Sequence, residues 1–486
     1  MENVFYSSRG WEDWEVPAKP AIPEGMPVLI DDDLLFEDVS GPRPTVAVNR
    51  WLRELPTNGC PAPKSWTYYA RTVKEWMEFL AEHGVGLFDT RARLKAALSA
   101  YAVYRATGPL KHHFEASTWN QNVGILAIFY RWAVDERYAD AEPFTYKQGT
   151  AYFSEKASEV QVNQARRRQA KSHVTIKYLE DDFAGMFLKA LAGLTPDGQD
   201  DPRYRGRELA RNAAVTRFVL SSGLRSQEYS YYLACEVPPL PRRPVKMPVP
   251  LPVPAAVTKG STFRVSWVDY ATLAELHSYI ELERSLAVDG STWRPPASWG
   301  EPMMVTEADE RGGRVDGVRV SWEDLGPKDR RRLVAPDGGS MLLAVRHDGG
   351  PFTAWGSVYS RASERIRERF EPRFPHVWPH RLRHTMAMKT MERLVRGYYA
   401  QAAQLVTDAD DDAAMALYLT KTEPLLVLRD LLGHSSALTT EKYLRRLDMT
   451  RIFREAYEKA GADAGLSDAA ADREAAAEFD DEEDDF

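Results

Sequence analysis

Residues 431–443 read Leu-Leu-Gly-His-Ser-Ser-Ala-Leu-Thr-Thr-Glu-Lys-Tyr and form the most informative stretch of this 486-residue chain. A glycine turn precedes His434, and Tyr443 follows nine residues later, beyond a pair of threonines. Of the 22 tyrosines in the chain, only Tyr443 follows a Gly-His turn through a Thr-Thr pair. A connection this short can bring the tyrosine hydroxyl and the histidine to one site.

Two upstream segments carry arginine and histidine where a turn leads into a helix. Residues 221–228 read Ser-Ser-Gly-Leu-Arg-Ser-Gln-Glu, which places Arg225 in the first turn of a helix. Residues 379–385 read Pro-His-Arg-Leu-Arg-His-Thr, in which His380 and Arg383 share one helical face. Each residue alone fits an ordinary ion pair, helix start or core position. Together and in this order, the three segments indicate one site.

These side chains suit an attack on a phosphodiester that needs no metal ion. Two arginines can bind the non-bridging phosphate oxygens through charge-assisted hydrogen bonds. Histidines donate hydrogen bonds and transfer protons near neutral pH. A tyrosine, with a pKa of about 10, becomes an effective nucleophile only when its proton is removed. The sequence has no acidic cluster typical of Mg²⁺ and no phosphate-binding Gly-rich loop, so we expect no metal and no cofactor.

The three segments resemble the signature motifs of the tyrosine recombinase, or phage integrase, family of site-specific DNA recombinases, and the resemblance covers about residues 44–457. It implies that Tyr443 is the nucleophile, which forms a 3′-phosphotyrosyl bond and releases a 5′-hydroxyl. The residues implied to activate the phosphate are Arg225, His380, Arg383 and His434.

The same family uses a lysine on a β-hairpin as the general acid for the leaving oxygen. The best match in this chain is Lys259, in Val-Thr-Lys-Gly at 257–260, just before a predicted strand with clear alternation at 263–267. Lys246 is the alternative. Prolines at positions 248, 250, 252 and 254 argue against a central strand just before this one.

Apolar residues recur with helical spacing between residues 44 and 150. One predicted helix, with Thr67 as its cap, carries Tyr69, Val73, Trp76, Met77 and Leu80 on one face. Two more helices are predicted after Thr90 and Thr118. The aromatic stripes are typical of a core. By the resemblance, this is the helical core-binding (SAM-like) domain, which contacts DNA.

The remaining segments divide the chain further. We expect an acidic, Pro-containing leader at 1–43, a basic linker at 151–175 and an acidic, disordered tail at 461–486. The linker contains Arg166, Arg167, Arg168 and Lys171 without an apolar face. This charge run is either solvated or lies along DNA phosphates.

Residues 176–460 are expected to form an α+β catalytic domain, with insertions near 287–350 and 393–424. The predicted fold class is therefore mainly α with a small β-sheet: an all-helical core-binding domain plus an α+β tyrosine-recombinase catalytic domain.

The charge distribution favours DNA as the partner, although the net charge is −8. Residues 1–43 carry −7 and residues 472–486 carry −8, so the residues between them carry +7. The chain has two cysteines, which is no disulfide framework, and no apolar run near the roughly 18 residues of a membrane span. We therefore expect a cytoplasmic, nucleoid-associated protein without a membrane partner.

The sequence thus predicts a site-specific tyrosine recombinase that cleaves and rejoins double-stranded DNA without metal or ATP, to integrate or excise a mobile element. Joining two duplexes needs four cuts, so we expect a homo-tetramer on paired DNA sites, with an accessory DNA-bending or directionality factor as a further partner. Two alternatives stay open. One is a type IB topoisomerase, which uses a similar residue set. The other is a catalytically silent DNA-binding accessory protein.

Overall fold

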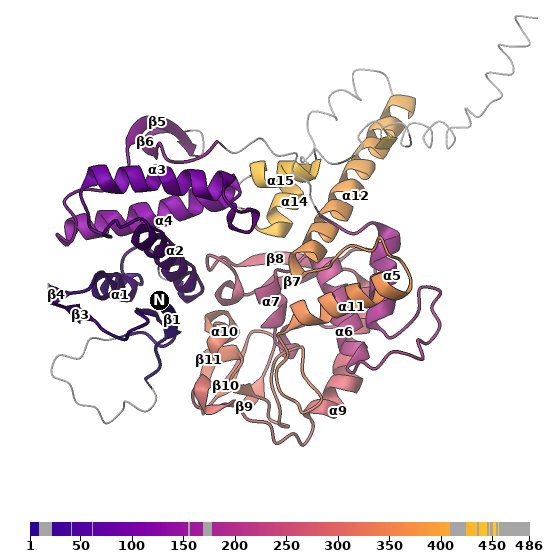
Figure 1. Cartoon of the computed structure of the whole chain (residues 1–486). Helices are drawn as coiled ribbons and strands as arrows, with labels where there is room; N and C mark the ends of the chain where they lie inside the picture. Colours follow the sequence, from indigo (N-terminus) through magenta and orange to yellow (C-terminus); the bar gives the residue numbers. More distant parts are fainter. Residues whose placement is uncertain are drawn as a thin grey trace, which may run out of the picture. The chain divides into compact units, whose positions relative to one another are not determined.

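The computed structural model describes residues 1–8, 22–39, 41–60, 62–153, 156–168, 177–408, 424–434 and 437–444, with residues 447, 451, 452 and 455. The chain divides into two compact units, Met1–His173 and Val174–Phe486. Helices make up most of the regular structure and the sheets are small (Figure 1). This confirms the prediction of a mainly α fold with small β-sheets. Among the described helices, none is long and apolar enough to cross a membrane.

Four helices form the body of the first unit. Their bounds are α1, Pro44–Glu54; α2, Pro63–Glu82; α3, Arg91–Thr107; and α4, Ala116–Asp135. The helices α2 to α4 correspond to the three predicted ones. Thr67 lies inside α2 instead of capping it, because Pro63 has the fixed φ that opens the helix one turn earlier. The core is aromatic, and Trp76 donates its indole N–H to the Tyr130 hydroxyl at 2.9 Å.

Residues 1–43 contain strands. The strand bounds are β1, Glu2–Phe5; β2, Pro27–Ile30; β3, Glu37–Asp38; and β4, Gly41–Pro42. β1 pairs with β2 and β3 with β4, both antiparallel. Met26 and Leu29 are buried in the helical core, and Leu29 exchanges two backbone hydrogen bonds of 2.8 Å with the Asn49 side chain. The acidic leader expected at 1–43 is therefore folded onto the helices at β2, whose alternating apolar side chains have a helical face to pack against.

The region expected to be a basic linker begins inside a β-hairpin. β5 (Tyr146–Phe153) and β6 (Lys156–Asn163) pair antiparallel. The chain then runs back along α4, where the Asn120 side chain bonds the N–H and the carbonyl of Arg167 at 2.8 and 3.0 Å. Up to residue 168, this segment is therefore folded onto the first unit.

The second unit combines helices with two small sheets. Its helix bounds are α5, Asp181–Leu191; α6, Leu209–Ser222; α7, Ser226–Ser230; α8, Tyr270–Tyr279; α9, Ser285–Val288; α10, Pro327–Arg330; α11, Trp355–Arg369; α12, Pro379–Asp408; α14, Pro424–Leu432; and α15, Ala437–Leu444. The main core includes fully buried residues of α6, among them Val215, Phe218 and Val219.

Two sheets complete this unit. Their strands are β7, Val249–Val253; β8, Arg264–Val268; β9, Met303–Ala308; β10, Gly312–Val315; β11, Val318–Ser321; and β12, Leu333–Val334. The four-stranded sheet, of order β11-β10-β9-β12, occupies the expected insertion at 287–350. β7 contains Pro250 and Pro252, yet pairs with β8. Prolines at every second position leave the N–H groups between them for the ladder, and β7–β8 is a two-stranded sheet in which neither strand is central.

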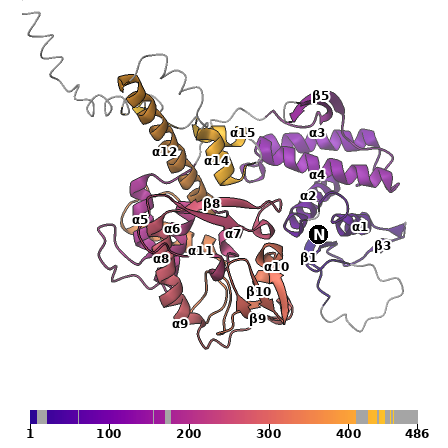
Figure 2. The same cartoon turned by 180° about the vertical axis from the view of Figure 1, so that it is seen from behind.

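The last helices pack around a separate apolar cluster. α12, α14 and α15 lie side by side (Figures 1 and 2). They contribute Met391, Leu428 and Tyr443 to this cluster. α12 begins where a helix was predicted and continues to Asp408, into the expected insertion at 393–424. Residues 409–423 and the acidic tail at 461–486 lie outside the described residues.

Candidate active site

A glycine turn at the end of α6 positions the first arginine. Gly223 has a φ of +66°, and a Cβ there would come within 2.9 Å of the Met386 side chain, so the turn requires glycine. α7 begins at Ser226, and Arg225 is its N-cap residue. The structure thus has the turn and the helix start that the sequence predicted here.

A buried carboxylate orients Arg225 and a second arginine. Glu228 of α7 has no exposed side-chain surface. It accepts a hydrogen bond of 3.1 Å from Arg225 and two, of 2.8 and 2.6 Å, from Arg264 of β8. Burial alone would raise the pKa of Glu228, but the hydrogen bonds and charge of Arg264 lower it below its ordinary value. Glu228 is therefore an anion that fixes both guanidinium groups.

Arg383 of α12 is buried, and its hydrogen bonds connect the turn at Gly223 with the turn at Gly433 after α14. Its guanidinium donates to the carbonyl of Gly223 at 2.5 Å and to the carbonyl of Leu432, while Arg225 donates to the carbonyl of Gly433 at 3.3 Å. Burial and the neighbouring arginine charges lower the pKa of Arg383 to about 9. Arg383 therefore remains charged at neutral pH, and an anion in the site would stabilise that charge.

Tyr443 lies on α15, where the sequence had predicted only a connection. Its side chain is 1% exposed, and its hydroxyl oxygen is 2.8 Å from Nδ1 of His384 on α12. Burial raises the pKa of Tyr443 to about 12, while the charges of Arg383 and Arg225 act in the opposite direction. At neutral pH the hydroxyl is therefore protonated and lies beside a group that can accept its proton.

The two predicted histidines lie on either side of this pair. His434 follows α14, and its Nδ1 is 2.9 Å from the buried Thr440 hydroxyl. Its ring is parallel to that of Tyr443, with centroids 6.4 Å apart. His380 is exposed in the first turn of α12 and stands edge-on to His384 at a centroid distance of 4.3 Å. His434 is thus beside Tyr443, and His380 is one ring further away.

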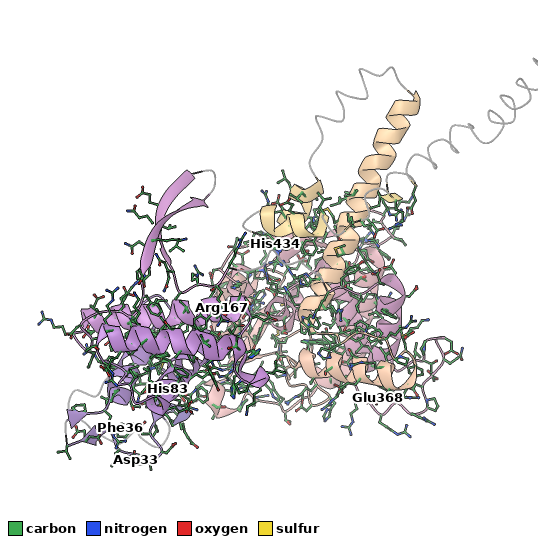
Figure 3. All side chains as sticks on the ribbon, turned by 45° about the horizontal axis from the view of Figure 1, so that its top comes forward. Asp33, Phe36, His83, Arg167, Glu368 and His434 are labelled. Atoms are coloured by element: carbon green, nitrogen blue, oxygen red, sulfur yellow. The ribbon has the colours of Figure 1, made fainter. Side chains whose placement is uncertain are left out.

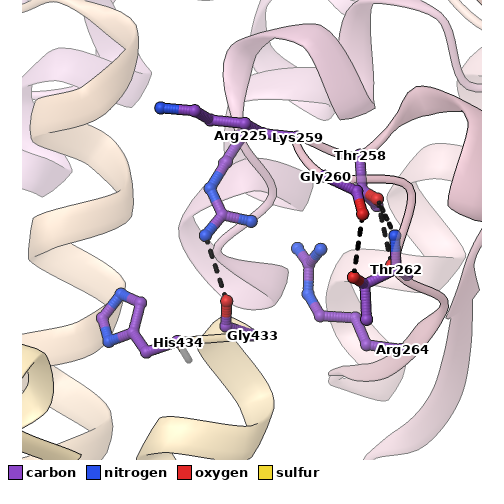
Figure 4. Close-up of a pocket in the computed structure, with 8 residues that line it drawn as sticks. All are labelled: Arg225, Thr258, Lys259, Gly260, Thr262, Arg264, Gly433 and His434. Atoms are coloured by element: carbon purple, nitrogen blue, oxygen red, sulfur yellow. Dashed lines mark hydrogen bonds between the residues drawn. The ribbon is translucent and has the colours of Figure 1, made fainter. Parts of the chain in front are cut away.

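A cavity of about 590 Å³ opens beside Arg225 and His434 (Figure 4). Lys259, in the loop between β7 and β8, also lines it and is exposed. The Thr258 hydroxyl holds this loop by accepting a 2.9 Å hydrogen bond from the backbone N–H of Thr262. The alternative lysine, Lys246, is exposed before β7 and does not line the cavity. The structure therefore places Lys259, and not Lys246, beside the arginines.

The predicted linker contacts have mixed surroundings. Arg167 (labelled in Figure 3) lies over the Trp119 ring at 4.5 Å and donates to the carbonyls of Phe114 and Ala102 at 3.2 and 2.5 Å. Burial lowers its pKa. Its contacts therefore hold the chain against the first unit. Arg166 and Arg168 are exposed. Lys171 lies outside the described residues.

Three residues of the site had no role in the sequence interpretation: Glu228, Arg264 and His384. Glu228 could have been found, because it lies one helical turn after Arg225. Arg264 could have been found from a less obvious pattern. It is a charged residue that shares one face of a strand with Ser266 and Val268. His384 stands next to Arg383 in the sequence, but its contact with Tyr443 spans 59 residues. Only the folded chain shows that contact.

Among the residues that the structure describes, no group of three or more His, Cys, Asp or Glu side chains could hold a metal ion.

No protein-family model matches the chain, and no curated protein is similar to it in sequence. Solved structures are similar to it at low identity. XerA recombinase has 15% identity over 82% of this chain and 92% of its own, with a TM-score of 0.31. XerH site-specific recombinase bound to difH substrate has 15% identity over 81% and 77%, with a TM-score of 0.38. The Tn1549 transposon integrase in complex with transposon right end DNA has 11% identity over 84% and 98%, with a TM-score of 0.43.

Proposed function

We propose that this chain is a site-specific tyrosine recombinase, which cleaves and rejoins duplex DNA through a 3′-phosphotyrosyl intermediate. One observation carries the proposal. The Tyr443 hydroxyl is hydrogen-bonded to His384, the residue that follows Arg383. The Tyr443 ring is also parallel to that of His434, which follows the Gly433 carbonyl that Arg225 binds. A nucleophile, a proton acceptor and two fixed cations therefore meet in one place.

The arginines bind the scissile phosphate. Arg225 and Arg383 are held by Glu228 and by backbone carbonyls, so their guanidinium groups need little reorganisation when an anion enters. As Tyr443 attacks phosphorus, negative charge grows on the non-bridging oxygens, and fixed donors stabilise that charge most in the transition state. His434 and His380 add further donors around the same phosphate.

Two proton transfers accompany the exchange. The Tyr443 oxygen forms a bond to phosphorus while the P–O5′ bond breaks. His384 Nδ1 accepts the phenol proton, since it already lies 2.8 Å from that oxygen. Lys259, exposed in the cavity beside Arg225, donates a proton to the leaving O5′. The phosphotyrosyl ester stores the energy of the phosphodiester, so rejoining needs no ATP.

The same chemistry sets the partners. Exchange between two duplexes needs four cuts, which four copies of the chain supply on paired double-stranded sites. Integration or excision of a mobile element, assisted by an accessory DNA-bending or directionality factor, is the process that we propose, and we place it in the cytoplasm at the nucleoid. The +7 charge on residues 44–471 supports DNA binding.

A supercoiled plasmid assay tests this function against its alternatives. The chain should recombine a plasmid that carries two cognate sites, without nucleotide and in EDTA, and Tyr443→Phe should abolish the product. Relaxation of any supercoiled plasmid without a cognate site would favour a type IB topoisomerase. Binding without any change of topology, in the parent and in the Phe variant alike, would favour a silent accessory protein.

A further inference from the structure

A second arginine-lined cavity lies elsewhere in the second unit. Its volume is about 460 Å³, and it is lined by the end of α5, the 203–208 segment, the start of α6 and one face of α11. Its arginines are Arg203, Arg205, Arg207, Arg211, Arg361 and Arg365. A single carboxylate, Glu208, lines it with them. No residue lines both this cavity and the one beside Arg225, so the proposed reaction does not account for it.

Two of these arginines form the inner wall and are structural. Arg211 is 2% exposed, donates to the carbonyl of Val345 at 2.9 Å and lies over the Phe352 ring at 3.8 Å. Arg365 lies over the Tyr204 ring at 4.2 Å. Burial lowers the pKa of Arg211 and of Arg365. These contacts keep two positive charges at the inner wall of the cavity.

The outer arginines lack carboxylate partners. Arg203, Arg207 and Arg361 are exposed, and within the described part of the chain none of the three forms an ion pair. Glu208 pairs with Arg211 at 3.6 Å, and the nearby Asp201 accepts two hydrogen bonds, of 2.6 and 2.9 Å, from Arg369 outside the cavity. The carboxylates near the cavity are therefore engaged, and the outer guanidinium groups repel one another.

We propose that this cavity is a second anion site, which binds consecutive phosphates of a DNA backbone. Guanidinium groups bind phosphate oxygens in pairs, and six arginines spread from a fixed inner wall to an exposed rim suit a ligand with several regularly spaced phosphates. The site would hold DNA without reading its sequence and without taking part in cleavage. The choice of DNA as the polyanion rests on the proposed function.

The test uses the full chain and removes the three outer charges together. None of the Arg203, Arg207 and Arg361 side chains donates to a protein group among the described residues, so Arg→Gln at all three removes charge without breaking an observed contact. A control variant changes the exposed Arg294, Arg311 and Arg314 to Gln, which removes the same charge outside both cavities. Binding of a short non-cognate duplex is measured from 50 to 300 mM salt, about the range in which phosphate contacts dominate.

The site variant should reduce the magnitude of the slope of log K against log salt by about 2.7, since each of the three phosphate contacts contributes about 0.9. The control variant should change the slope by less than about 1. Equal slopes in the parent, site and control variants would overturn the proposal. So would a slope difference that disappears when residues 472–486 are deleted, because the acidic tail would then be the natural occupant. Inorganic phosphate alone is also tested as a competitor of the duplex. If it competes at concentrations that leave the slope unchanged, the cavity is a site for free phosphate, and the proposal is overturned.

The outcome is separable from that of the proposed function. The site variant should still form the Tyr443 adduct at saturating cognate DNA, because none of its changed residues lines the cavity beside Arg225. If no adduct forms even in the parent, the recombinase proposal fails, while a slope difference would still support the second anion site.

Discussion

The two arginine-lined cavities of the second unit differ in what holds their arginines. Beside the nucleophile, Arg225 and Arg383 are held by the buried Glu228 and by backbone carbonyls. In the second cavity, Arg203 and Arg361 are exposed, with no carboxylate partner among the described residues. A guanidinium that is fixed before the ligand arrives can favour one geometry of charge, as catalysis requires. A guanidinium without partners can follow a polyanion of variable course, as binding requires.

The largest expected effect separates the two kinds of arginine directly. Arg383→Lys keeps the charge but loses the planar fork, and we expect single-turnover cleavage at saturating DNA to fall about 10³-fold. Arg361→Lys in the second cavity should change the same rate less than about twofold, since a point charge serves binding nearly as well. The rates are measured on a cognate duplex under matched salt. Comparable losses in both variants would remove the distinction between the cavities.

The next effect concerns the anion that fixes the arginines. Glu228→Gln should lower the free energy of unfolding by about 3 kcal/mol at pH 7, because it leaves buried positive charge uncompensated. The control, Glu275→Gln, removes the carboxylate partner of Arg217, whose side chain is 44% exposed, and should cost less than about 1 kcal/mol. Urea unfolding of the parent and of both variants measures these losses of free energy.

The pH dependence of that difference follows from the pKa of Glu228. Its folded-state pKa is lowered, so its stabilisation is present above the unfolded value of about 4.3 and is lost as pH falls through the lower folded-state value. The gap between the parent and Glu228→Gln should therefore shrink in acid. A gap that stays constant down to pH 3 would show that Glu228 acts without its charge.

A smaller effect tests the proton acceptor. His384→Gln can keep a hydrogen bond to Tyr443 but cannot accept its proton, so cleavage at pH 7 should fall about 10²-fold. Because the pKa of Tyr443 is raised to about 12, the rate of the variant should rise with pH toward that value. The control is His376→Gln, an exposed histidine stacked on Trp378. A pH–rate profile of His384→Gln parallel to that of the parent would assign His384 a structural role only.

The smallest effect concerns the acidic end of the chain. Residues 472–486 carry a net charge of −8, which opposes DNA binding electrostatically. Deleting them should tighten non-specific DNA binding several-fold at 50 mM salt and very little at about 300 mM. A salt-titrated gel-shift assay measures this. Unchanged or weaker binding at low salt would exclude this role for the tail.

Local patterns in the sequence predicted much of the site, because a turn and the helix after it depend on adjacent residues. The Gly223 turn, the start of α7 and the start of α12 all follow from such patterns. Tyr443 was identified without its helix, since the Ala-Leu-Thr-Thr-Glu-Lys-Tyr segment was interpreted as a connection.

Contacts between distant segments could not be predicted in this way. The alternation in β8 shows which residues share a face but not which face is buried. In the structure Arg264 and Ser266 face inward, while Phe263, Val265 and Trp267 are 47%, 39% and 37% exposed. The reason is Glu228, whose buried charge needs Arg264. In the same way, the composition of the acidic leader at 1–43 does not show that β2 packs against α1 and α2.

The most direct test of the account is to trap the covalent intermediate and map it. A cognate duplex, nicked so that the fragment with the 5′-hydroxyl diffuses away, is incubated with the full chain in EDTA without nucleotide, and the protein–DNA adduct is digested and analysed by mass spectrometry. We predict one modified peptide, with the 3′-phosphate on Tyr443, and no adduct with Tyr443→Phe, which should still bind the duplex. An adduct on another residue, or one that persists in the Phe variant, would contradict the account.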